Sequence, residues 1–257
     1  MPPKNLWTRE ELIVAFNLYL TIEFGKIHSR NPDVKRLAEI IGRTPGAISR
    51  RLANFSSIDP FHLQRGVKGL DRGKRQVEPI WNEFFNNKEE LIYESEKFLA
   101  ARESMSIEEK YKDILYDLKD LKGETIIREV RTRVNQCAFR KIVLANYSNK
   151  CAITGIDIPE LLFASHIIPW SANEKYRLEP ENGICFSALY DKAFDKGLIG
   201  INLNHEIILS DTIKRKKNTD FYAQHFNSIE NQKIIKAQKY SPRKEFLEYH
   251  LDTIFNK

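Results

Sequence analysis

Four polar residues between positions 166 and 195 have side chains suited to hydrolytic chemistry. His166 ends a short apolar run that is typical of a strand, and Asn182 lies in a predicted turn. Asp191 and Asp195 lie four residues apart on a helix predicted over 186–196. Residues at i and i+4 share a helix face, so both carboxylates can point towards the strand that ends at His166. The stretch therefore supplies a base, an amide that can orient this base, and oxygen ligands for a hard cation.

The elements that must position these residues are a helix, short strands and a second helix, all after residue 123. On the first helix Arg133, Gln136 and Arg140 repeat at i, i+3 and i+7 and therefore share a face. Such a face can hold a phosphate. An ordinary solvated helix surface has the same pattern, so both interpretations stay open.

Several short motifs occur in an order that resembles the HNH family of ββα-metal endonucleases. These motifs are CAITG from residue 151, SHIIPW from 165, NG from 182 and FDKGL from 194. The resemblance extends over about 125–255, roughly half of the chain. An ordered series of motifs is far more specific than an isolated histidine or aspartate pair.

The resemblance implies a role for each candidate residue. His166 matches the general base that takes a proton from the attacking water, and Asn182 matches the asparagine that holds the loop which orients this base. Asp191 stands at the last motif position, which is usually a histidine or asparagine and a metal ligand. Ser165 replaces a residue that binds metal in other branches, and Asp195 stands where some members have a further metal-binding histidine.

The resemblance also implies a divalent metal cofactor. An aspartate in the last motif position shifts the site towards oxygen ligands, which favours Mg²⁺ over Zn²⁺, with Mn²⁺, Co²⁺ or Ni²⁺ as alternatives. A cation on the scissile phosphate would stabilise the extra negative charge during attack by water. We therefore expect a metal-dependent endonuclease that cleaves DNA phosphodiester bonds.

The N-terminal part is predicted to be helical, with a helix–turn–helix layout over 34–55. Thr8 and Glu11 have the spacing of a capping box at the first helix. Further along, Gly42 can end one helix while Thr44 caps the next. This layout is common in DNA-binding domains.

The second helix of this pair has an apolar stripe made by Ile48, Leu52 and Phe55. Its other face is predicted to be open, and it carries Ser49, Arg50, Arg51 and Asn54. Arginine and asparagine can make bidentate contacts with guanine and adenine, so this face suits the major groove of double-stranded DNA. The alternative is an ordinary surface helix. Further candidates for DNA contact in and after this segment are Arg43, Arg65, Lys68 and Arg72.

The positive charge of the chain is concentrated around this segment. The formal net charge is +6, and residues 30–75 contain 11 Lys or Arg but only 4 Asp or Glu. The remaining residues therefore have a combined net charge close to zero. A basic window of this kind is the electrostatic footprint of a phosphate-binding surface.

These patterns predict an α+β protein of three parts. A mainly helical domain of the helix–turn–helix or winged-helix type is expected over 1–99, a charged helical linker over 100–123, and a ββα-metal nuclease domain over 124–257. The sequence contains no apolar run long enough to span a membrane, and its three cysteines include no CxxC pair. The chain is therefore expected to be cytoplasmic.

Three functions are compatible with this organisation. The leading interpretation is a restriction-type endonuclease that acts as a homodimer on double-stranded DNA. The second is a nuclease of phage defence that requires a modified base. The third is a DNA-binding regulator with an inactive nuclease domain, and the presence of His166, Asn182 and Asp191 argues against it.

Overall fold

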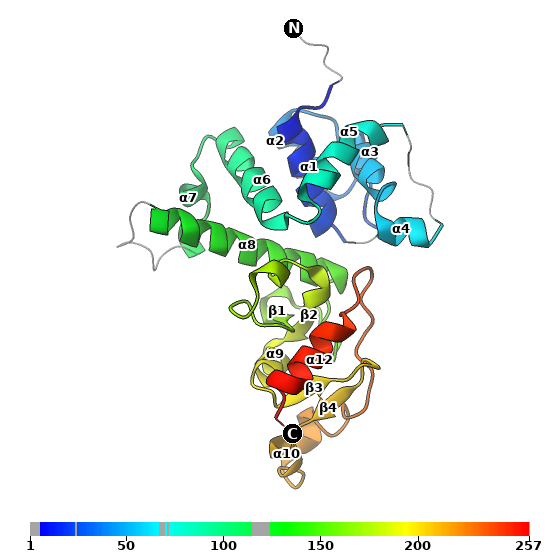
Figure 1. Cartoon of the computed structure of the whole chain (residues 1–257), viewed down its shortest axis with the longest axis vertical. Helices are drawn as coiled ribbons and strands as arrows, with labels where there is room; N and C mark the ends of the chain where they lie inside the picture. Colours follow the sequence, from blue (N-terminus) through cyan, green and yellow to red (C-terminus); the bar gives the residue numbers. More distant parts are fainter. Residues whose placement is uncertain (1–5, 24, 67–69, 71, 115–123, 257) are drawn as a thin grey trace. The chain divides into compact units, whose positions relative to one another are not determined.

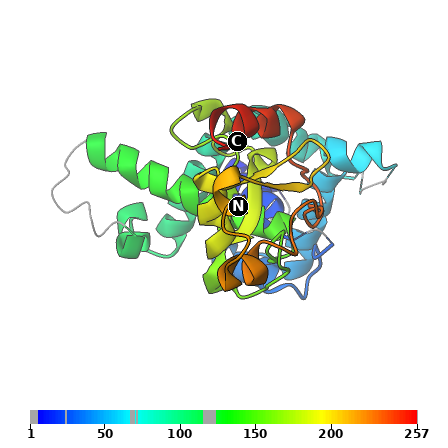
Figure 2. The same ribbon diagram turned by 90° about the horizontal axis from the view of Figure 1, so that it is seen from below.

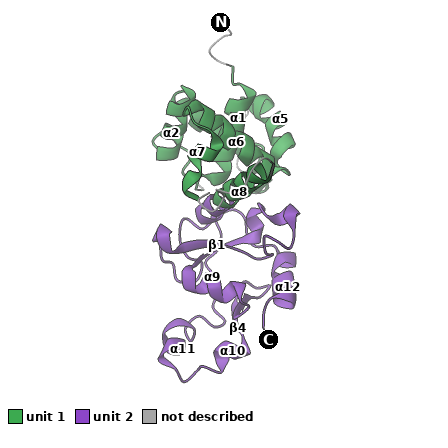
Figure 3. Ribbon diagram, turned by 90° about the vertical axis from the view of Figure 1, so that its left-hand side faces the viewer, with its two compact units in different colours: residues 1–138 green, residues 139–257 purple. Residues whose placement is uncertain are grey.

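The computed structural model describes residues 6–23, 25–66, 70, 72–114 and 124–256. The chain forms two compact units, Met1–Ala138 and Phe139–Lys257 (Figure 3). Helix α8 (Glu124–Asn146), coloured green in Figure 2, is one helix whose residues are divided between the two units. The units therefore divide at a later residue than the predicted domains. One reason is an ion pair of 2.9 Å between Arg131 of α8 and Glu90, which ties the first part of α8 to unit 1.

The described residues of unit 1 form helices joined by turns and loops, with no strand among them (Figure 1). Its elements before α8 are α1 (Arg9–Thr21), α2 (Pro32–Ile41), α3 (Pro45–Ser56), α4 (Pro60–Gln64), α5 (Lys74–Phe84), α6 (Lys88–Arg102), α7 (Ile107–Lys110) and the 3₁₀ turn η1 (Lys112–Ile114). The predicted helical linker thus contains the end of α6, α7 and η1, and residues 115–123 lie outside the described residues.

The predicted helix ends in unit 1 are confirmed. The Thr8 hydroxyl accepts from the Glu11 amide at 3.2 Å and the Thr8 amide donates to the Glu11 carboxylate at 2.9 Å, which is a capping box. Gly42 ends α2 in the left-handed conformation, with φ of 70°. The Thr44 hydroxyl then accepts from the Ala47 amide at 3.2 Å and begins α3. Such a cap stabilises a helix by about 1 kcal/mol.

The predicted apolar stripe of α3 is confirmed as part of the core of unit 1. Ile48, Leu52 and Phe55 are fully buried. The Phe55 ring stacks on Phe16 of α1 with centroids 4.8 Å apart, and Phe16 also contacts Trp81 of α5 at 5.1 Å. Aromatic contacts of this kind therefore join α1, α3 and α5.

Unit 2 contains two antiparallel sheets of two strands each within the described residues. After the last part of α8, its elements are η3 (Pro159–Leu161), β1 (Leu162–His166), η4 (Glu174–Tyr176), η5 (Pro180–Asn182), β2 (Gly183–Ser187), α9 (Ala188–Asp195), β3 (Ile199–Ile201), β4 (Ile207–Leu209), α10 (Asp211–Lys214), α11 (Asp220–His225) and α12 (Lys244–Thr253). The chain is thus α+β, as predicted.

The order β1, β2, α9 supplies the predicted strand, strand and helix. In the hairpin, His166 pairs with Gly183 and Phe163 pairs with Phe186. The predicted helix over 186–196 begins two residues too early, because Phe186 and Ser187 belong to β2.

Glycine at position 183 allows β2 to lie close to α8. A Cβ atom there would lie 2.4 Å from Val143 Cγ2 and 2.8 Å from the Phe139 ring. Any larger residue would therefore push the hairpin away from the helix. None of the described helices has the length and hydrophobicity that a membrane span requires.

Candidate functional site

His166 lies at the end of β1, and its hydrogen bonding fixes which ring nitrogen carries the proton. His166 Nε2 lies 2.9 Å from the carbonyl oxygen of Arg177. A carbonyl oxygen only accepts hydrogen bonds, so Nε2 must be the protonated nitrogen in the neutral ring. The lone pair is then on Nδ1. His166 can therefore accept a proton at Nδ1 while the opposite nitrogen stays anchored.

The surroundings of His166 keep its ring neutral. The ring stacks on Phe139 with centroids 3.8 Å apart and planes 13° apart, and the Trp170 ring meets it edge-on at 5.5 Å. Burial lowers the pKa of His166 to about 4, against the opposing effect of the Arg177 carbonyl. At neutral pH the imidazole is thus unprotonated, which is the state that a general base requires.

Asn182, at the end of η5, closes the loop that connects β1 to β2. Its side chain is almost completely buried. The amide oxygen accepts from the Ile168 backbone N–H at 2.8 Å, and the amide nitrogen donates to the carbonyls of Ile168 at 3.1 Å and Tyr176 at 3.0 Å. One buried amide thus joins both ends of the loop that presents the Arg177 carbonyl to His166.

Arg177 is a further residue of this loop that the motif spacing did not single out. Its Nε donates to the carbonyl of Trp170 at 2.8 Å, its guanidinium lies 5.2 Å from the Trp170 ring centroid, and it pairs with Glu174 at 3.3 Å. These contacts restrain the residue whose carbonyl anchors His166. Because only the folded loop brings them together, no short-range signal in the sequence could have identified Arg177.

The structure brings the side chains of Ser165, which precedes His166 on β1, and Asp191 together. The buried Ser165 hydroxyl donates to Asp191 Oδ1 at 2.5 Å. Since Ser165 precedes His166 on β1 and Asp191 lies in the first turn of α9, the carboxylate is oriented towards the strand that carries the candidate base. The predicted direction of Asp191 is therefore observed.

Asp195 lies one helical turn beyond Asp191. Partial desolvation and the neighbouring Asp191 carboxylate both raise the pKa of Asp195 above the ordinary value of an aspartate. A cation near these carboxylates would favour the ionised form of Asp195.

The donor set fits an open site for a hard cation. Asp191 and Asp195 offer carboxylate oxygens and Ser165 offers a hydroxyl, all of them ligands that Mg²⁺ accepts. In the part of the chain that the structure describes, no group of three or more His, Cys, Asp or Glu residues is arranged to hold a metal. An ion at Asp191 would complete its shell with water and substrate oxygens.

The three residues of α8 that were predicted to hold a phosphate differ in their surroundings. Arg140, in unit 2, donates from Nη2 to the carbonyls of Pro159 at 2.7 Å and Leu162 at 3.1 Å, and so braces the start of β1. Arg133 and Gln136 belong to unit 1 and are half-buried. The buried Nε of Arg133 has no hydrogen-bond partner among the described residues.

Two predicted base contacts on α3 are corrected by the structure. Arg51 is 8% exposed and Asn54 is 4% exposed, so the prediction that they lie on an open face is wrong. Asn54 Nδ2 donates to the carbonyls of Leu70 at 2.7 Å and Arg72 at 2.9 Å. Arg51 donates to Gln76 Oε1 at 2.7 Å. The segment that leads into α5 therefore covers this side of α3.

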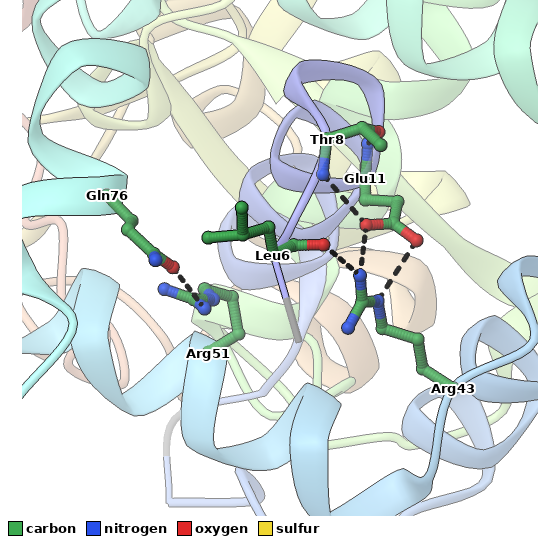
Figure 4. Close-up of polar contacts among 6 residues, drawn as sticks. All are labelled: Leu6, Thr8, Glu11, Arg43, Arg51 and Gln76. Atoms are coloured by element: carbon green, nitrogen blue, oxygen red, sulfur yellow. Dashed lines mark hydrogen bonds and ion pairs between the residues drawn. The ribbon is translucent and has the colours of Figure 1, made fainter. Parts of the chain in front are cut away.

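Arg43 is also held inside unit 1. Its guanidinium donates to both carboxylate oxygens of Glu11, at 3.0 and 2.6 Å, and to the Leu6 carbonyl at 2.7 Å (Figure 4). It lies 4.5 Å from the centroid of the Trp7 ring. This bidentate pair joins the start of α1 to the turn before α3, and it leaves Arg43 with a structural role in the free protein.

The other predicted contacts in unit 1 remain at the surface. Arg50, Arg65 and Arg72 are exposed, and Ser49 is partly exposed. Lys68 lies outside the described residues.

Comparison with known proteins agrees with the geometry of unit 2. A search of curated proteins gives no match to the chain. Residues 151–202, which span the β1–β2 hairpin, its connecting loop, α9 and β3, match the family described as HNH endonuclease. This part of the chain, with His166, Asn182 and Asp191 inside it, is therefore similar to HNH endonuclease domains, for which nuclease activity on DNA is the general expectation.

Proposed function

We propose that this chain is a metal-dependent, restriction-type endonuclease in which unit 2 cuts DNA and unit 1 reads it. The observation that supports it best is the state of His166. Its Nε2 is bound by the Arg177 carbonyl, its pKa is lowered to about 4, and it directly follows Ser165, whose hydroxyl binds Asp191. A neutral base and an oriented carboxylate on one hairpin and the helix after it are groups that hydrolysis of a phosphodiester requires.

In this mechanism each residue of the hairpin has one task. His166 Nδ1 takes a proton from water, whose oxygen forms a bond to phosphorus while the bond from phosphorus to the 3′ oxygen breaks. Asn182 holds the connecting loop, so that the Arg177 carbonyl keeps the imidazole in the correct tautomer. Transition states of this kind need the base at a fixed distance from the water.

Asp191, with Asp195 and Ser165, would hold the divalent ion. When bound, the ion neutralises the charge that develops on the phosphate and on the leaving oxygen. Oxygen ligands favour Mg²⁺, and Mn²⁺, Co²⁺ or Ni²⁺ can replace it.

Plasmid cleavage tests the proposal. Supercoiled plasmid incubated with the protein and Mg²⁺ should become nicked or linear, and EDTA should stop the reaction. The same assay on plasmid with and without modified bases separates a restriction enzyme from a modification-dependent defence nuclease. A protein that binds plasmid but never cuts it with any of the four ions would be the inactive regulator, and the proposal would fail.

A further inference from the structure

The N-terminus of α5 has features that suit an anion. Gly73, the residue before the helix, has no side chain with which to cap it. The first turn contains Lys74 and Arg75 and no acidic residue. A helix start leaves its first N–H groups without partners inside the helix and carries partial positive charge. The side-chain charges of Lys74 and Arg75 are repelled by this partial positive charge, and a bound anion would offset the repulsion.

Arg51 of α3 is a second, independent feature that suits an anion at the same place. Its Nη2 donates to Gln76 in the first turn of α5 (Figure 4). Its Nε and Nη1 are buried and have no hydrogen-bond partner in the described ranges. The Trp7 ring covers the guanidinium with a centroid distance of 4.6 Å. Arg51 is thus a buried cation, more than nine-tenths enclosed, that points to the start of α5.

Among the described residues, no carboxylate forms an ion pair with Arg51. Burial lowers its pKa to about 10, and the neighbouring Arg43 acts in the same direction. The nearby Glu11 opposes this effect but is already paired with Arg43 at 2.6 Å. A buried charge is costly unless an opposite charge accompanies it, so an anion at α5 would stabilise this arrangement.

The start of α5 is held in place before any ligand binds. Asn54 fixes the carbonyls of Leu70 and Arg72, the residues that lead into the helix. Gly73 has φ of 109°, and a Cβ atom on it would lie 2.6 Å from Asn54 Oδ1. Only glycine fits there, so the helix N-terminus is pre-organised against α3.

We propose that the N-terminus of α5, with Lys74 and Arg75 in its first turn and Arg51 behind it, binds a backbone phosphate of duplex DNA. The inference rests on the proposed function and deepens it, because it assigns to unit 1 a contact that positions DNA without reading its sequence. Arg51 supplies charge and holds Gln76, and the exposed Lys74 and Arg75 meet the phosphate.

Binding of a labelled duplex by the full chain in EDTA tests the site. Arg51→Met and the double variant Lys74→Gln/Arg75→Gln should each weaken binding by about tenfold at moderate salt. The slope of log Kd against log salt should fall by about 0.9 for each phosphate that the variant no longer neutralises. Arg102→Met, which removes one exposed charge from α6, is the matched control and should change Kd less than about twofold.

Two further measurements make the result decisive. Because no described carboxylate pairs with this buried charge, Arg51→Met should keep or raise the thermal midpoint of the free protein, whereas a purely structural arginine would lower it. Inorganic phosphate should compete with the duplex only at far higher concentration than an unlabelled duplex does, because a free ion makes one of the several contacts that a duplex makes. Stronger competition would assign the site to free phosphate and overturn the DNA assignment.

The failure of this inference is distinguishable from the failure of the proposed function. If the wild-type protein cuts plasmid with Mg²⁺ but both variants bind DNA as well as Arg102→Met does, only the α5 site is refuted. If no divalent ion supports cutting while the variants still lose DNA affinity as described, the nuclease proposal fails and the phosphate site stands.

Discussion

Two histidines of unit 2 have nearly the same surroundings, and the comparison shows what makes one of them a candidate base. His250 stacks on Phe194 at 3.7 Å, its Nε2 lies 3.1 Å from the Phe194 carbonyl, and burial lowers its pKa to about 4, as for His166. However, His250 is only 1% exposed and its Nδ1 is buried without a partner in the described chain. Of the two, only His166 directly follows a residue, Ser165, that orients a carboxylate.

Substitution of the two aspartates tests the assignment of the metal ligand. Asp191→Ala should abolish cleavage in Mg²⁺, because the cation loses the carboxylate that Ser165 orients. Asp191→His should retain some activity and prefer Mn²⁺, Co²⁺ or Ni²⁺, since imidazole suits those ions better. Asp195→Ala should have a smaller effect. The cleavage rate of each variant is measured with each metal ion. A larger loss of rate for Asp195→Ala than for Asp191→Ala in Mg²⁺ would contradict the assignment.

The positions of His166, Asn182 and Asp191 could be predicted because a hairpin and the helix after it form over a short stretch of chain. Arg51 and Asn54 could not be placed in the same way. Helical periodicity identifies the apolar face of α3, but it does not reveal that the segment before α5 folds over the opposite side. Contacts between residues far apart in sequence decide such positions.

Among the elements of unit 2, the loop between β1 and β2 determines how well His166 is oriented. Arg177→Met should lower kcat by about tenfold or more while leaving DNA affinity nearly unchanged, because misplacement of a base affects the transition state and not binding. Single-turnover cleavage and duplex binding measure the two effects separately.

Arg243→Met is the matched control for this loop. Arg243 pairs with Glu179 at 3.6 Å and with Glu181 at 3.7 Å, both in the same loop. None of the contacts described for Arg243 involves the Arg177 carbonyl. Arg243→Met should therefore change kcat by less than about twofold relative to the wild-type protein. Equal effects of the two substitutions on kcat would mean that Arg177 acts only through general stability of the loop.

Element boundaries show a second limit of the sequence patterns. The end of α2 and the start of α3 were predictable because Gly42 and Thr44 have chemical roles that do not depend on distant residues. The start of α9 was misplaced because Phe186 has to pair with Phe163, and this pairing is visible only after the hairpin has formed.

For the whole molecule, the number of chains on DNA follows from the chemistry. One HNH site cuts one strand, so a restriction-type enzyme needs two sites for a double-strand break, and we predict a homodimer on DNA with two-fold symmetry. Sedimentation of the complex in EDTA should give two protein chains per duplex. One chain per duplex together with only nicked plasmid would contradict the dimer.

The division of the whole chain was harder to predict than its elements. The sequence changes character near residue 124, where α8 begins, but the compact units divide further along the same helix. A continuous helix contains no glycine, proline or composition change at such a point, so its two parts are assigned by packing alone.

The central claim is that His166 is the general base, and cleavage by two matched variants tests it most directly. His166→Gln should retain DNA binding but lose at least about 100-fold in cleavage rate, the usual contribution of such a base. His250→Gln alters a histidine with the same stacking and the same lowered pKa outside the candidate site, and its folded fraction should cut at nearly the wild-type rate. Wild-type cleavage by folded His166→Gln, or an equal loss in both variants, would contradict the mechanism.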